Sequence, residues 1–91
     1  MENVLKYRSR TDIIVLMLTT AKELQGVNKT RIMYEAFVSY AQMKEYLELL
    51  LGNGMLEHIQ NKRYRTTEKG LRMIDAYQRA AQLVGTKDIK L

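Results

Sequence analysis

Residues Asn28–Thr67 read NKTRIMYEAFVSYAQMKEYLELLLGNGMLEHIQNKRYRTT, and this stretch decides the fold. Asn28 is a typical helix N-cap, and the apolar spacing after it predicts a short helix over about 29–36. Ser39 has a glutamine three residues later, which is a capping box. A second helix is therefore expected over about 40–51, after a connection of only three residues.

Apolar residues recur along this second helix at the spacing of one buried face. They are Tyr40, Met43, Leu47, Leu50 and Leu51. Gly54 is expected to take the left-handed conformation that ends a helix. Two short runs containing Ile, Tyr and Thr then flank Asn61–Arg63, which predicts a β-hairpin over about 55–66.

The segments outside this stretch complete one small domain. Upstream, Ser9 predicts the start of a helix over about 10–24, and Gly26 follows its end. Downstream, Thr67 is expected to cap a last helix over 68–85, and Gly70 in its first turn suits close backbone packing. We divide the chain into a basic N-terminal arm (1–8), a domain of helices and hairpin (9–67), the C-terminal helix (68–85) and a flexible tail (86–91).

The order of these elements predicts a mainly α fold with a small β-hairpin. Two helices joined by so short a turn match the helix-turn-helix unit, whose second helix enters the major groove of DNA. A hairpin directly after that unit is the winged arrangement. The expected fold is therefore a winged helix-turn-helix with a long C-terminal helix.

Composition narrows the function further. The 91 residues carry 15 Lys and Arg against 10 Asp and Glu, and the net charge of +5 favours a polyanionic partner. Residues 61–72 concentrate five basic residues against Glu68 alone. The absence of Cys excludes disulfides and thiolate metal sites, and the apolar run Ile13–Leu18 is far below the roughly 20 residues that span a bilayer. We expect a cytoplasmic, nucleoid-associated protein.

No catalytic constellation, cofactor motif or small-molecule site can be assembled from the residues present. His58 is the single histidine, and one imidazole without thiolates does not make a metal site. The expected protein is not an enzyme and has no cofactor and no metal.

Double-stranded DNA is the predicted partner, bound by helix 40–51 in the major groove and by the hairpin on phosphates. The residues expected to contact DNA are Lys29, Thr30, Arg31, Ser39, Tyr40, Gln42, Lys44, Lys62, Arg63 and Arg65. Gln42 can pair with adenine, and cations on a protruding turn suffice for phosphate contact. The arm, with Lys6 and Arg8, and the adjacent Arg10 would follow the backbone or a minor groove.

Two alternatives remain open. Glu45 and Glu48 on the recognition helix would also suit a winged-helix module that docks a protein without reading DNA. RNA binding is the weaker alternative, because no aromatic stacking platform is evident.

The last helix predicts assembly into a homodimer. Its apolar residues follow steps close to a coiled-coil seam and are Leu71, Ile74, Tyr77, Ala81 and Val84. Such a dimer would place two recognition helices on one duplex.

The segments KTRIMYEAFVSYAQMKEYLELLLGNGMLE and YRTTEKG also resemble an archaeal winged helix-turn-helix family. That family carries a KTRIMY…LSY…L..YL..L…GL signature and an LTEKG start to its last helix, and the resemblance covers roughly Ser9–Leu83. It includes chromatin proteins of about ten kilodaltons and related transcription regulators. The resemblance implies DNA binding and, in the chromatin branch, dimers joined by an antiparallel coiled coil of the last helices. Glu45 and Glu48 depart from the family pattern, since some relatives carry Lys on this helix.

Overall fold

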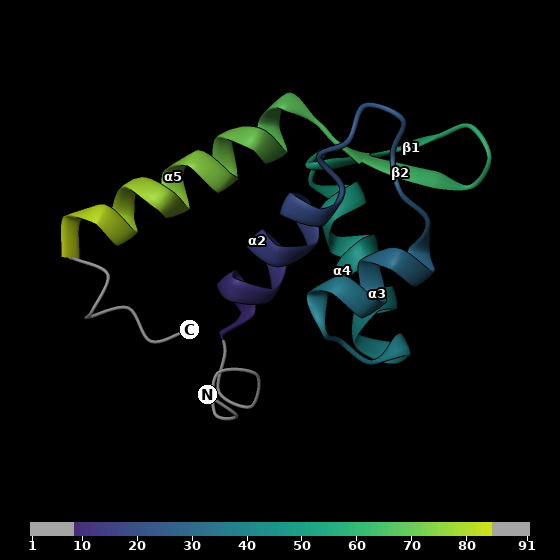
Figure 1. The fold of residues 1–91 in the computed structure, drawn as a ribbon, viewed down its shortest axis with the longest axis horizontal. Coiled ribbons are helices and arrows are strands. Elements are labelled where there is room, and N and C mark those ends of the chain that lie inside the picture. The colour runs from purple at the N-terminus through teal and green to yellow at the C-terminus, as the bar shows by residue number, and fades with distance from the viewer. Residues whose placement is uncertain (1–8, 85–91) are drawn as a thin grey trace.

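The computed structural model describes residues 9–84, which form a helical body with a hairpin at one end (Figure 1). In chain order the elements are α2 (Arg10–Thr20), α3 (Lys29–Ala36), α4 (Tyr40–Gly52), β1 (Leu56–Ile59), β2 (Arg63–Thr66) and α5 (Glu68–Val84). The predicted fold class, a mainly α winged helix-turn-helix with a long C-terminal helix, is confirmed. The predicted arm (1–8) and tail (86–91) lie outside the described residues.

Local capping sets where the helices begin, as the sequence predicted. The Ser9 and Ser39 hydroxyls each accept a hydrogen bond from the third helical N–H, and Asp12 and Gln42 complete the two capping boxes. Asn28 caps α3 through the Arg31 N–H at 2.8 Å. At the start of α5 the Thr67 hydroxyl accepts from the Gly70 N–H at 3.2 Å. Each cap satisfies an N–H that has no partner inside its helix.

The predicted end of the first helix, at about residue 24, is wrong. Helix α2 ends at Thr20, and the chain then turns toward β2. The Ala21 carbonyl accepts the Thr66 N–H at 2.9 Å, and Val27 forms an antiparallel bridge with Tyr64. The segment that good helix formers predicted as helix therefore runs beside the hairpin instead, because tertiary hydrogen bonds outweigh a weak helix propensity.

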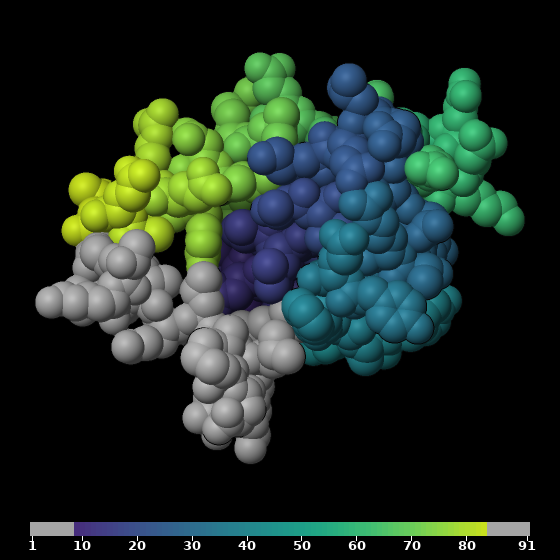
Figure 2. All heavy atoms as spheres, viewed as in Figure 1, coloured from purple at the N-terminus to yellow at the C-terminus, as the bar shows by residue number. Residues whose placement is uncertain are grey.

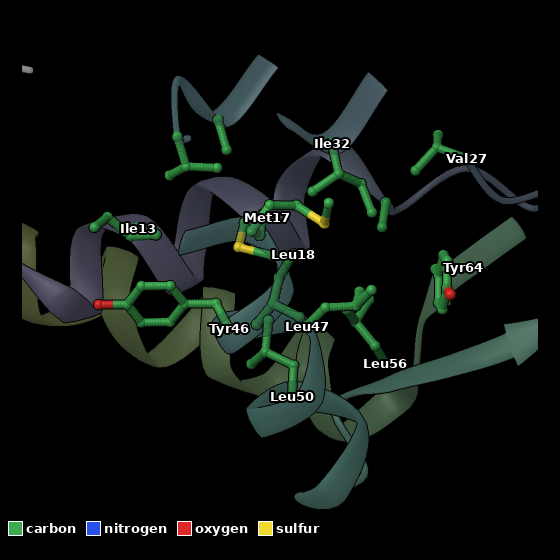
Figure 3. Close-up of a cluster of buried hydrophobic side chains, with 14 of the residues drawn as sticks. Ile13, Met17, Leu18, Val27, Ile32, Tyr46, Leu47, Leu50, Leu56 and Tyr64 are labelled. Atoms are coloured by element: carbon green, nitrogen blue, oxygen red, sulfur yellow. The ribbon is translucent and has the colours of Figure 1, made fainter. Parts of the chain in front are cut away.

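Aliphatic side chains and methionines fill the core between α2, α3, α4 and the hairpin (Figure 3). Met17, Leu18 and Ile32 are fully buried, and Leu50 is 1% exposed. Such burial contributes about 1.5–3 kcal/mol per large side chain, so the inner face of α4 holds that helix in place.

Tyr40 was predicted on this buried face but is 59% exposed, because it opens α4 and no preceding helical turn covers it. Tyr46 is buried instead, at 6% exposure, with its ring close to Ile13 in Figure 3. The guanidinium of Arg10 lies 5.4 Å from the centre of the Tyr46 ring. This contact ties the start of α2 to the middle of α4.

Strands β1 and β2 pair antiparallel, with Leu56 opposite Thr66 and Ile59 opposite Arg63. The turn is therefore residues 60–62, one residue earlier than predicted, and Asn61 and Lys62 take positive φ angles of 62° and 57°. We call β1, β2 and this turn the wing. The wing tip and the outer end of α5 protrude at opposite ends of the molecule (Figure 2).

Helix α5 leaves the hairpin at a very close backbone contact and crosses α2. A Cβ on Gly70 would lie 2.4 Å from the Met55 carbonyl oxygen, so the predicted close backbone packing at Gly70 is confirmed. Ile74 packs into the core at 5% exposure, and the Tyr77 hydroxyl donates to Asp12 Oδ1 at 2.8 Å. These contacts fix the direction of α5 relative to the body.

Candidate nucleic-acid interface

Three elements carry the residues predicted to contact DNA, beginning with the amino end of α3. Lys29 and Thr30 are exposed in its first turn, where unpaired backbone N–H groups favour an anion. The Val27–Tyr64 bridge lies two residues before Lys29, so the fold brings this helix end beside the wing.

Arg31, in the same turn, makes ion pairs within the protein. Its guanidinium contacts the Glu23 carboxylate through both terminal nitrogens and the Glu35 carboxylate through Nε at 2.8 Å. The hydrogen bonds to Glu23 and Glu35 raise the pKa of Arg31 above its ordinary value. Two carboxylates thus offset the positive charge of Arg31, one of the residues expected to contact DNA.

The amino end of α4 is the second part of the site. Ser39 and Gln42 are exposed but bonded to each other's backbone, with the Gln42 Oε1 accepting the Ser39 N–H at 3.2 Å. To pair with adenine through its whole amide, Gln42 would have to share its Oε1 between the two partners or give up that bond. Tyr40 and Lys44 are exposed on this helix, and so are Glu45 and Glu48. The outer face of α4 is therefore mixed in charge.

The wing is the third part, and its three predicted cations differ in their surroundings. Lys62 is exposed at the turn, whereas Arg63 and Arg65 are half-buried. Arg63 Nη1 donates to the Gly26 carbonyl at 3.1 Å, and Arg65 Nη1 donates to the Leu24 carbonyl at 2.8 Å. A shallow groove beside the tip is lined by Gln25, Ile59, Gln60, Asn61, Arg63 and Arg65.

The carbonyl acceptors at Leu24 and Gly26, and the Val27–Tyr64 bridge that presents them, were not predicted from the sequence. Gly26, at φ 75°, allows the approach, since a Cβ there would lie 2.6 Å from Ile59 Cδ1 and 3.0 Å from the Tyr64 carbonyl. The local feature that could have indicated an extended segment is Val27, a β-branched residue between Gly26 and the Asn28 cap.

Helix α5 presents the predicted dimer seam unevenly. Leu71 is 43% exposed and Ala81 is half-buried, while Ile74 and Tyr77 contact their own domain. Partial burial is the larger cause and the hydrogen bond to Asp12 the smaller one, and together they raise the pKa of Tyr77 to about 12. Val84, the last residue predicted for the seam, ends α5.

Residues 9–84 hold neither a metal-binding cluster nor a membrane-spanning helix. No group of three or more His, Asp and Glu side chains in this range is arranged to hold a metal ion. No helix in the same range is long and apolar enough to cross a membrane.

Comparisons with known proteins point to one family. Residues 7–84 match the model of a winged helix-turn-helix family. An uncharacterised protein of Methanocaldococcus jannaschii is 28% identical over 80 residues, which cover 88% of this chain and 80% of that protein. The crystal structure of Sso10a-2, a DNA-binding protein from Sulfolobus solfataricus, superposes with a TM-score of 0.70 at 25% identity, covering 84% of this chain and 81% of that one.

Proposed function

Because the chain belongs to the winged helix-turn-helix family, we propose that it binds double-stranded DNA, with α4 in the major groove and the wing on phosphates. Lys29, Lys44 and Lys62 carry the proposal. They lie exposed on the three elements that this geometry turns toward the duplex, and no ion pair is seen for them within residues 9–84. The likeness to Sso10a-2, which binds DNA, supports the same function.

The mixed charge of α4 favours binding that depends more on phosphates than on base reading. Lys29, Thr30 and the first N–H groups of α3 would hold one phosphate, with Arg31 contributing less because its charge is offset. Tyr40 and Lys44 would lie along the major groove, and Lys62 would reach the phosphates beside it. Ser39 and Gln42 would contact DNA only by sharing or leaving their capping bonds.

Such binding suits a nucleoid-associated protein or a transcription regulator of relaxed specificity. Genome-wide mapping of occupancy separates the two roles. Broad coverage would favour the nucleoid role, and a few sharp peaks would favour a regulator.

Titration of a fluorescent duplex at several salt concentrations tests DNA binding. The logarithm of the association constant should fall linearly with that of the salt concentration. The variants Lys29→Gln, Lys44→Gln and Lys62→Gln should each reduce the slope by about 0.9 for every phosphate that is no longer neutralised. Arg79→Gln is the matched control, because Arg79 forms an exposed pair with Asp75 on α5. It removes one positive charge far from the proposed interface and should leave the slope unchanged.

Failure of the wild-type protein to bind any duplex at low salt would sink the proposal. In that case a protein-docking role would be favoured, because Glu45 and Glu48 are exposed on the outer face of α4.

We also propose that α5 joins two copies of the chain. Its 17 residues include exposed Leu71 and Leu83, the latter 87% exposed, while Ile74 is used within the domain. Sedimentation of the wild type and of Leu83→Glu measures this. A dimer that the variant weakens supports the proposal, and a wild-type monomer at high concentration contradicts it.

A further inference from the structure

The wing carries three cations, and two of them are bonded to the body of the protein. Arg65 donates through Nε to Glu57 Oε2 at 2.9 Å and through Nη1 to the Leu24 carbonyl at 2.8 Å. Arg63 donates to the Gly26 carbonyl at 3.1 Å. Both arginines therefore bridge β2 to residues 24–26.

Side chains alternate between the two faces of β2, and this explains why both arginines can bond to residues 24–26. Tyr64 and Thr66 are buried and face the core, so Arg63 and Arg65 lie on the opposite face of the strand. Glu57 is directly opposite Arg65 in the register, which places an acceptor beside its guanidinium. The flat, multiply donating guanidinium can bond to Glu57 and to Leu24 at the same time.

The wing needs such support because its own strands are short. Each has four residues, and an isolated two-stranded hairpin is marginal in water. Beyond β1, the backbone of the strand Arg63–Thr66 is held to the body by the Val27–Tyr64 pair, at 2.9 and 2.7 Å, and by the Thr66–Ala21 bond. Residues 21–27 thus lie beside β2, on the side away from β1. The side chains of Arg63 and Arg65 add further hydrogen bonds to this segment.

Lys62 differs from both arginines. It lies at the turn, exposed, with a positive φ of 57°, and its side chain makes no bond within residues 9–84. We infer that Arg63 and Arg65 are positioning residues that hold the wing against residues 24–26, and that Lys62 makes the wing's phosphate contact. The second half of this inference rests on the proposed function, and the first half does not.

Two measurements on four variants test the inference. The first is the salt dependence of duplex affinity. The second is hydrogen exchange of the Val27 and Tyr64 N–H groups without DNA, because these groups pair between the wing and the body. The variants are Lys62→Gln, Arg65→Gln, Arg65→Lys and the control Ile13→Val, which removes one buried methylene far from the wing and lowers the overall stability modestly.

Lys62→Gln should reduce the salt slope by about 0.9 per protomer and leave the exchange unchanged. Arg65→Gln and Arg65→Lys should both speed exchange at the two N–H groups about five- to tenfold and weaken binding alike, without changing the slope. Ile13→Val should leave affinity and slope unchanged, which separates wing positioning from a general loss of stability.

The opposite pattern would overturn the inference. If Arg65→Gln lowers the slope as much as Lys62→Gln while Arg65→Lys restores it, then Arg65 contacts a phosphate. Unchanged exchange in both Arg65 variants would also overturn it. If the wild type binds no duplex, the proposed function fails, yet the exchange measurement still decides whether Arg65 positions the wing.

Discussion

The wing and helix α4 are both assigned to DNA, but they are held in place in opposite ways. Helix α4 is fixed by its inner face, where Met43, Tyr46, Leu47 and Leu50 are buried. The wing has few buried side chains, and its outward arginines bond to backbone carbonyls of another segment.

This difference decides which charges are available to a ligand. On α4, apolar burial supplies the stability, so exposed residues such as Lys44 need no structural bond. On the wing, polar residues supply part of the stability, so their charges are partly committed. Counting basic residues therefore overestimates the positive charge that the wing can offer to phosphates. On α4 the same count is closer to the charge that is available.

The largest expected effect comes from separating the wing from the body. Gly26→Ala would place a Cβ at φ 75° against Ile59 and the Tyr64 carbonyl, and should lower the free energy of unfolding by about 2–4 kcal/mol. Gly52→Ala in α4 is the matched control. A Cβ there meets nothing within 4 Å, and stability should stay the same or rise by up to about 1 kcal/mol. Denaturant unfolding measures both, and equal losses would erase the contrast between the two regions.

A smaller effect should uncouple stability from binding at the wing tip. Lys62→Gly relieves a left-handed backbone conformation and removes the exposed charge. Unfolding should show equal or up to about 1 kcal/mol greater stability, while duplex affinity at low salt falls several-fold. Lys62→Gln separates the contributions, because it should weaken the affinity without gaining the stability. Unchanged affinity in both variants would remove Lys62 from the interface.

The smallest effect is expected on the outer face of α4. Glu45→Gln removes an exposed carboxylate near the proposed major-groove contact, and duplex affinity at low salt should rise by about two- to fivefold. Asp75→Asn on α5 makes the same charge change away from that face and should have little effect. A loss of affinity in Glu45→Gln would instead indicate that Glu45 reads a base, as a carboxylate accepting from cytosine can.

The helix starts could be predicted because a cap is made within four consecutive residues. Ser9, Asn28 and Ser39 each meet an N–H three residues on, and no other part of the chain is needed. The place of α4 after the three-residue turn followed from the same local rules. The end of α2 could not be predicted, since it depends on bonds to Tyr64 and Thr66, more than thirty residues away.

The candidate site also has features that follow from local sequence and features that depend on distant contacts. The sequence by itself determined how many cations the chain has and which elements carry them, because charge and element type follow from composition and local pattern. Only the tertiary structure decided which charges are available. Arg63 and Arg65 find their carbonyl acceptors 37 and 41 residues away, and Arg31 finds Glu23 within the α2–α3 connection, eight residues before it. A guanidinium bonds to whichever acceptors the folded chain brings within reach, and local spacing does not reveal contacts made over such distances.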